Sequence, residues 1–155
     1  MIKYFPLFVN ITDKNIRVFG GGTIATRRVK SLLEFGAAVH VVAPEITEEL
    51  KELAERQEKL SLYFRKYRPS ELSEEDFVLA ATDDEQVNDT IFRECRHKEI
   101  PVNTASDKEK CDFYFPGIVQ AGEVTVGVNA GGRNHRKAAE LTEKIRDQVS
   151  NWEGE

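Results

Sequence analysis

Three consecutive glycines, Gly20–Gly22, separate an apolar run from a helical pattern, and they limit the fold more than any other part of the chain. The run Asn15–Gly20 (NIRVFG) has the β-branched and aromatic composition of a buried strand. Together with Ala25 the turn has the form G-x-G-x-x-A, which between a strand and a helix is typical of dinucleotide binding. We predict that Gly20 allows the tight turn, that Gly22 lets a pyrophosphate approach the backbone, and that Ala25 lets the helix pack closely on the strand.

The first amides of the helix after the glycines have no partners within the helix, and their partial positive charge suits phosphate. A tight turn without a ligand is the alternative interpretation. An acidic residue for the ribose hydroxyls is expected about 20 residues further on, where Ala43 and Pro44 stand, with Glu45 next. Because a carboxylate there would repel a 2′-phosphate and no arginine follows, we predict NAD and not NADP as the cofactor.

Beyond the glycines, apolar runs of strand length alternate with helical patterns. Such alternation is typical of a parallel sheet that helices cover on both faces. We expect further strands at residues 39–43, 60–64, 76–81 and 100–103, and helices at about residues 24–36, from Thr47 onward, and at Glu85–Lys98.

The pattern changes after the aromatic run Phe113–Phe115. Two short extended segments, Gly117–Val119 and Val124–Val128, have a turn between them, which predicts a hairpin. A helix at about Arg136–Val149 then follows.

These patterns predict an α/β fold with two parts. Residues 1–115 would form a Rossmann-like doubly wound parallel sheet that binds NAD, and residues 116–155 a small dimerisation region of a β-hairpin and a helix. We expect a homodimer, because the aromatic run and the strand at residues 124–128 would leave apolar surface and unpaired strand edges in a small monomer.

A second group of polar residues, Thr82–Asp84, follows the strand expected at residues 76–81. Ligands of open parallel sheets bind at the carboxyl ends of the strands, so we predict that Thr82 contacts the ribose or the nicotinamide. Capping of the next helix by Thr82 or Asp83 is the alternative, and both roles are compatible.

Composition and charge exclude several classes of function. The 155 residues carry a net charge of −5, which argues against broad nucleic-acid binding. No apolar stretch approaches the roughly 18–20 residues of a membrane helix, and the N-terminus lacks the apolar block of a signal peptide. Two cysteines without CxxC spacing and three scattered histidines predict neither a disulfide framework nor a resident metal, and they favour a reducing cytoplasm.

Four segments have a more specific pattern than the glycine turn alone. They are FPLFVNITDKNIRVFGGGTIATRRVKSLLEFGAAVHVVAPE, VLAATDDEQVN, PVNTASDKEKCDFYFPGIV and VTVGVNAGG. With them the chain resembles the precorrin-2 dehydrogenase/sirohydrochlorin ferrochelatase family, the N-terminal module of siroheme synthases, over about residues 4–132. The resemblance implies an oxidoreductase of siroheme biosynthesis, which oxidises the tetrapyrrole precorrin-2 to sirohydrochlorin with NAD. Some members also insert ferrous iron, so the resemblance implies iron as a second substrate in part of the family.

The resemblance also implies which residues contact NAD. By position in the family, the contacts are Gly22, Thr23, Ile24, Pro44, Glu45, Thr82 and Asn103. The turn motif adds Gly20 to this predicted set.

The catalytic carboxylate of the family has no direct counterpart in this chain. By position the family's aspartate falls on Ser106, and Asp107 is the next residue. A serine cannot act as an unaided general base at neutral pH, whereas a carboxylate can. We therefore predict Asp107 as the base and Ser106 as a hydrogen-bonding partner of the substrate, with capping of the loop as the alternative role of both side chains.

Precorrin-2 carries many carboxylates and needs a basic surface. Arg133, His135 and Arg136 gather with Lys137 at the start of the last helix, where cations oppose the helix dipole and a bound anion would relieve the conflict. A solvated run of charges is the alternative. Arg28 and its charged neighbours on the first helix are expected to face solvent.

The serine at position 106, and a C-terminal region shorter than the family's, support a second hypothesis. In it the chain is a non-catalytic module that binds NAD or a tetrapyrrole and acts as a carrier or as a subunit of a tetrapyrrole-synthesis assembly. Turnover of precorrin-2 with NAD separates the two hypotheses.

Overall fold

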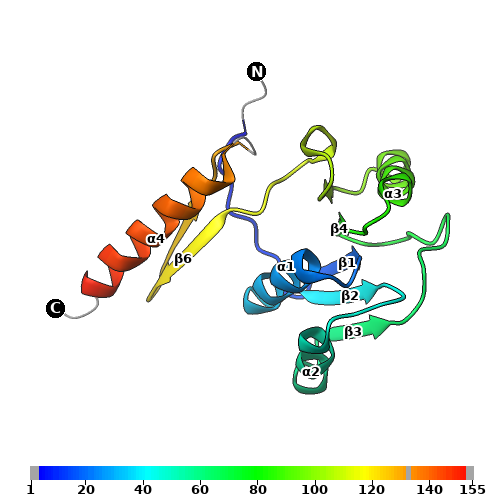
Figure 1. Ribbon diagram of the computed structural model, residues 1–155, viewed down its shortest axis with the longest axis horizontal. Coiled ribbons are helices and arrows are strands. Elements are labelled where there is room, and N and C mark those ends of the chain that lie inside the picture. The colour runs from blue at the N-terminus through cyan, green and yellow to red at the C-terminus, as the bar shows by residue number, and fades with distance from the viewer. Residues whose placement is uncertain (1–3, 132–133, 153–155) are drawn as a thin grey trace. The chain divides into compact units, whose positions relative to one another are not determined.

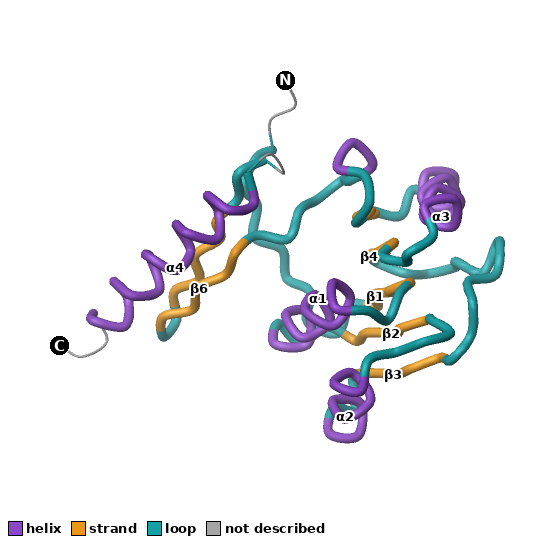
Figure 2. The backbone as a smooth tube through the Cα atoms, viewed as in Figure 1, coloured by secondary structure: helices purple, strands orange, loops and turns teal. Residues whose placement is uncertain are grey.

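The computed structural model describes residues 4–131 and 134–152 of the chain. These residues form two compact units (Figures 1 and 2). The first unit is Leu7–Phe113, and the second joins the N-terminal residues up to Pro6 with the chain from Tyr114 onward. Arg133, one of the predicted substrate contacts, lies outside the described residues.

A five-stranded parallel sheet forms the centre of the first unit, with the strand order β3-β2-β1-β4-β5 (Figure 1). The order reverses between β1 and β4, and the carboxyl ends of these strands form the switch point where such sheets bind ligands. The predicted doubly wound parallel sheet is thereby confirmed. The strands are β1 (Asn15–Phe19), β2 (Ala38–Val42), β3 (Leu60–Tyr63), β4 (Phe77–Ala80) and β5 (Val102–Thr104).

Three helices follow strands of this sheet, namely α1 (Thr23–Glu34), α2 (Glu48–Arg56) and α3 (Glu85–Lys98). Crossovers between parallel strands are right-handed, and those of α1 and α2 run across the sheet in the direction opposite to that of α3. The first two helices therefore cover one face and α3 covers the other. Under α3 lies a buried apolar cluster of Phe19, Val42, Leu72, Val78, Ala80, Ile91, Cys95, Ile100 and Val102.

The last strand of this sheet begins two residues later than the sequence predicts. α3 ends at Lys98, and its C-cap Glu99 has a left-handed backbone with φ 57°. The N–H of Ile100 then donates to the carbonyl of Cys95 at 2.9 Å, so Ile100 closes the helix. Because Pro101 has no N–H for a strand, pairing with β4 starts at Val102.

The connection between β3 and β4, residues 64–76, is described throughout and contains no helix. One carboxylate, that of Glu94 on α3, holds much of it in place. This carboxylate accepts hydrogen bonds from the N–H of Ser70 (3.1 Å), the N–H of Leu72 (2.9 Å) and the hydroxyl of Tyr67. Lys98 of α3 also donates to the carbonyl of Leu72. The β3–β4 connection, called the strap below, is therefore fixed to α3 by these two side chains.

The second unit consists of a hairpin and a long helix. β6 (Gly117–Ala121) and β7 (Val124–Val128) pair antiparallel, as predicted, and α4 (His135–Trp152) follows them. The helix packs closely on the hairpin, because a side chain added at Gly117 would collide with the nearly buried Thr142 of α4. Across the part of the chain that the structure describes, no helix is long and apolar enough to cross a membrane.

Candidate functional site

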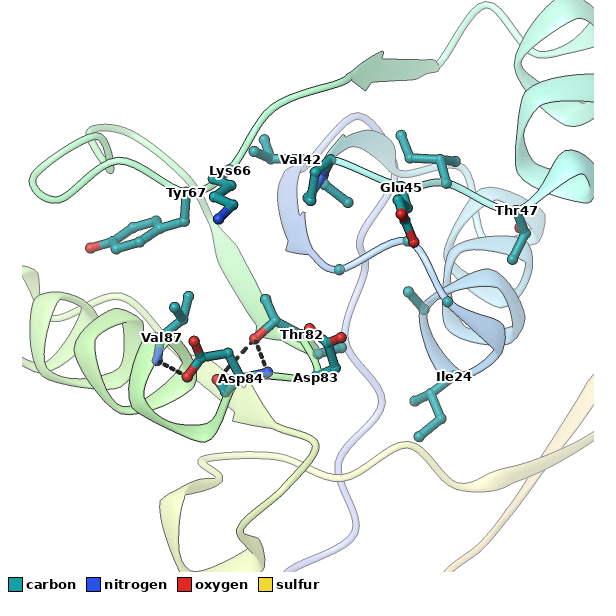
Figure 3. Close-up of a pocket in the computed structure, with 18 of the residues that line it drawn as sticks. Ile24, Val42, Glu45, Thr47, Lys66, Tyr67, Thr82, Asp83, Asp84 and Val87 are labelled. Carbon is teal, nitrogen blue, oxygen red and sulfur yellow. Dashed lines mark hydrogen bonds between the residues drawn. The ribbon is translucent and has the colours of Figure 1, made fainter.

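A cavity of about 990 Å³ lies at the carboxyl ends of the central strands of the first unit (Figure 3). Four connections that are far apart in sequence line it. These are the glycine turn with the start of α1 (residues 20–25), the β2–α2 connection (residues 42–47), Lys66 and Tyr67 of the strap, and the start of α3 (residues 81–84 and Val87).

The three glycines of the turn differ in what requires them. Gly20 has a φ of 118°, and a Cβ there would collide with the carbonyl of Ala81. A Cβ at Gly21 would collide with the carbonyl of Glu45. Gly22 has an ordinary φ of −85°, and no heavy atom lies within 4 Å of the position of its Cβ. Packing within the protein therefore requires the first two glycines, whereas the third leaves space open on the wall of the cavity.

The N-terminus of α1 lies at this open position and is not capped by a side chain. Its N-cap is Gly22, and its first turn holds no acidic residue. The other two helices of the unit are capped, α2 by Thr47 and α3 by Asp84. The free amides of α1 and its helix dipole thus make the cavity wall a site for an anion such as a diphosphate. Thr23 and Ile24, both predicted cofactor contacts, are exposed in this turn and line the cavity.

Pro44 and Glu45 also line the cavity, directly after β2, and both are exposed. Figure 3 shows the Glu45 carboxylate on the cavity side of its loop. An acidic group at the end of the second strand occupies the position from which dinucleotide-binding sheets contact ribose hydroxyls.

Lys66 and Tyr67 are lining residues that the sequence analysis missed. Lys66 is the single lysine or arginine among the described lining residues, and Figure 3 shows its ammonium group near the cavity. The Tyr67 ring packs edge-on against Phe19 at 5.1 Å, and burial together with the Glu94 carboxylate raises the pKa of its hydroxyl. No periodicity marks the strap that carries them, so the sequence offered no signal.

Thr82 lines the cavity at the end of β4, and its hydroxyl accepts a hydrogen bond from the N–H of Asp84 at 3.2 Å. The alternative interpretation, a cap of α3 at Thr82 or Asp83, is wrong, because Asp84 caps the helix through the amides of Gln86 (2.9 Å) and Val87 (3.2 Å). An aspartate with an extended backbone one residue before the helix is a good N-cap, and Thr82 supports the turn that precedes it.

Asn103 does not line the cavity, and the residue is buried, with 2% of its surface exposed. Its carbonyl oxygen accepts from the Arg28 guanidinium at 2.6 Å, and its amide donates to the carbonyl of Phe113 at 2.7 Å. The expectation that Arg28 faces solvent is wrong, because the residue is half-buried and its guanidinium is bonded to Asn103. This burial lowers the pKa of the guanidinium. The sequence could not show that helix and strand place these two residues side by side.

The two candidate catalytic residues lie at a second, smaller cavity of about 210 Å³, also in the first unit. Asp107 caps a short 3-10 helix (η1, Lys108–Lys110) by accepting the N–H of Glu109 at 2.9 Å, which is the alternative role weighed from the sequence. Its second oxygen is 3.4 Å from the Lys110 ammonium, which also pairs with Asp89 at 2.5 Å. Ser106 is exposed, and its hydroxyl accepts from the amide of Asn88 at 3.2 Å.

The predicted substrate contacts His135 and Arg136 begin α4 in the second unit, where both are exposed. Arg136 pairs with Glu140 one turn along the helix at 2.9 Å. One amide of this helix start is not free for an anion, because the Asn134 side chain accepts the N–H of Lys137 at 2.9 Å. No group of three or more histidine, cysteine, aspartate or glutamate side chains suited to a metal occurs among the described residues.

The strand order, the glycine turn and the uncapped helix at the switch point define a dinucleotide-binding domain of the Rossmann class. Comparison with known proteins agrees, because residues 7–117 match the family model described as "Putative NAD(P)-binding". The chain therefore belongs to this NAD(P)-binding family.

Its relatives confirm the resemblance to the precorrin-2 dehydrogenase group. The chain is 40% identical over 144 residues to the "Probable multifunctional siroheme biosynthesis protein HemA" of Ruminiclostridium josui, covering 92% of this chain and 28% of that protein. It is 34% identical over 144 residues to the siroheme synthase of Mannheimia succiniciproducens, covering 93% and 30%. The solved structure of SirC, a precorrin-2 dehydrogenase, matches with a TM-score of 0.73 and 28% identity, covering 96% of this chain and 70% of that one. The chain thus spans less than a third of the length of these two curated relatives.

Proposed function

We propose that this chain oxidises precorrin-2 to sirohydrochlorin in siroheme biosynthesis, with NAD bound in the larger cavity. The observation that carries the proposal is Gly22, whose open side faces the cavity beside the uncapped amides of α1. A Cβ would occupy this space, and a diphosphate would fill it while satisfying the amides. When bound, NAD supplies the acceptor for the hydride.

In this proposal the residues of the chain bind and orient the two reactants. The amides of Gly22, Thr23 and Ile24 hold the diphosphate. Glu45 accepts hydrogen bonds from ribose hydroxyls, and Thr82 contacts the nicotinamide half at the end of β4. Glu45 favours NAD, because its carboxylate would repel the 2′-phosphate of NADP.

The chemistry at the ring needs a group that takes a proton. We assign this role to the Asp107 carboxylate, with Ser106 as a hydrogen-bonding partner of the substrate. Both reach the smaller cavity. We assign the carboxylates of precorrin-2 to the basic start of α4, where His135 and Arg136 are exposed, together with Arg133.

A binding and turnover experiment tests the proposal. Titration calorimetry with NAD and NADP measures affinity, and the absorbance of NADH then follows oxidation of precorrin-2 by the full chain. We expect NAD to bind more tightly than NADP, and NADH and sirohydrochlorin to form together. Absence of binding by both dinucleotides would overturn the proposal. Addition of ferrous iron to the product tests whether this chain also accepts iron as a substrate.

The non-catalytic alternative has one observation in its favour. The Asp107 carboxylate is already engaged, because it caps η1 and lies near the Lys110 ammonium. A chain that binds NAD or a tetrapyrrole without turnover would act as a carrier or as a subunit of a tetrapyrrole-synthesis assembly. Binding of both ligands without formation of NADH would favour this alternative.

We further propose that the first unit binds the cofactor and that the second unit joins two copies of the chain. Val124 of the hairpin and Leu141 of α4 are 53% and 48% exposed, and a second copy would cover them. Light scattering should give the mass of a dimer.

Both free cysteines are buried, and burial raises the pKa of the Cys95 thiol to about 12, so this thiol is unreactive and suits a reducing cytoplasm.

A further inference from the structure

The two cavities of the first unit share a wall, the first turn of α3. Asp84 and Val87 line the larger cavity, whereas Glu85, Gln86 and Asp89 line the smaller one. Asn88 lies in the same turn and lines neither cavity, and its side chain is completely buried.

Each hydrogen-bonding position of the Asn88 amide has a partner within reach, and three of its four contacts are with Thr82. Its carbonyl oxygen accepts the N–H of Thr82 at 3.1 Å and lies 2.7 Å from the Thr82 hydroxyl, whose single hydrogen also has the carbonyl of Asp84 within reach at 3.0 Å. One of its N–H groups donates to the carbonyl of Thr82 at 3.1 Å, and the other donates to the hydroxyl of Ser106 at 3.2 Å. A side-chain amide offers two donors and two acceptor positions, so none is left over.

This bonding pattern fixes the orientation of the amide. The N–H of Thr82 can only donate and its carbonyl can only accept, so the oxygen and nitrogen of Asn88 cannot exchange places. The remaining N–H must then point at Ser106. A second tie, the ion pair between Asp89 and Lys110, holds the same loop to the same turn of α3 at 2.5 Å.

We propose that Asn88 is a positioning residue, through which a dinucleotide contacting Thr82 orders the loop that carries Ser106 and Asp107. The inference rests on the proposed function, because it assigns dinucleotide to the cavity that Thr82 lines. Movement of the Thr82 backbone changes the direction of the Asn88 amide, and this amide bears directly on the Ser106 hydroxyl. Binding of the cofactor and ordering of the candidate catalytic loop are then coupled.

Hydrogen–deuterium exchange on the full chain, with and without saturating NAD, tests the coupling. We expect NAD to slow exchange of the amides at residues 105–110 about ten-fold, although no direct contact is assigned to them. In Asn88→Ala and Ser106→Ala this slowing should disappear. In Ser106→Ala, which leaves Thr82 held by Asn88, the affinity for NAD should stay within about three-fold. Ser106→Ala guards against misfolding, because it leaves the three contacts between Asn88 and Thr82 in place.

Two further variants separate positioning from general stability. Cys95→Ala, also buried on α3 but outside the link, should lose stability yet keep the NAD-dependent slowing. Ser106→Thr restores a hydroxyl and should recover the slowing. If NAD binds and exchange at residues 105–110 does not change, or changes equally in Ser106→Ala, the inference is overturned and the proposed function survives. If neither dinucleotide binds, both fail.

Discussion

The two cavities of the first unit differ in whether the groups proposed to meet the ligand already have hydrogen-bond partners in the protein. The larger one presents backbone amides at an uncapped helix and a glycine with open space, groups that have no partner within the described protein. The smaller one presents Ser106, Asp107 and Lys110, and each of these side chains is bonded to a neighbour. A site made of unpartnered backbone is ready for a ligand, whereas a site made of bonded side chains must exchange existing bonds for new ones.

The comparison between glycines gives the largest expected effect. Gly20→Ala should lower the free energy of unfolding by about 3 kcal/mol, because the backbone is left-handed and the methyl group meets the carbonyl of Ala81. Chemical denaturation measures the loss. A stability unchanged from wild type would show that the turn relaxes easily and that its glycines are not set by packing.

Asp107→Asn tests the smaller cavity, whose side chains are already bonded. Asparagine also caps helices, so η1 should survive, while loss of the carboxylate should lower the rate of precorrin-2 oxidation about a hundred-fold. NAD affinity, measured by calorimetry on the same preparation, should not change. A normal rate would reject Asp107 as the base and leave it with its structural role.

Gly22→Ala tests the larger cavity, and it is the matched control for Gly20→Ala because both variants add one methyl group to the same turn. Nothing in the protein meets the new methyl group, so stability should change by less than about 0.5 kcal/mol. The methyl group would stand where the diphosphate is proposed, so NAD affinity should fall about ten-fold. Equal affinities in the variant and the wild type would move the cofactor away from the turn.

Glu45→Gln addresses the choice of cofactor at the rim of the same cavity. With the carboxylate removed, Lys66, the one lysine or arginine among the described lining residues, would attract a 2′-phosphate. The ratio of NADP to NAD affinity should rise about three-fold. Glu45→Asp, which keeps the charge, is the control and should leave the ratio low.

The smallest effect lies away from both cavities and gives the baseline for stability. Hydrogen bonds from the N–H of Asn15 and from Lys14 lower the pKa of Asp76 below 3.8. Its contribution to folding is therefore present above pH 3.8 and is lost as the pH falls through the lower, folded-state value. Asp76→Asn should cost about 0.5 kcal/mol at pH 7 and nothing in strong acid, as measured by urea unfolding across this range.

Local pattern was enough to predict the sheet, because β-branched runs bounded by glycine and proline permit few alternatives. It also identified Gly22, since the turn motif is contiguous in the chain. Asn88 escaped because the helical periodicity of α3 marks apolar residues as inward-facing, and a buried amide is stable there only through Thr82 and Ser106. Lys66 escaped because its segment has no period at all.

The strap over residues 64–76 is bonded to α3, the same helix whose first turn separates the two cavities. Glu94 bonds the strap about two turns beyond Asn88. α3 therefore holds both Tyr67, which lines the larger cavity, and Ser106, which lines the smaller one. A sideways shift of α3 would therefore change the shape of both cavities together. Substitutions that repack the underside of α3, such as those at Ile91, should therefore change cofactor affinity and reaction rate together, even though Ile91 lines neither cavity.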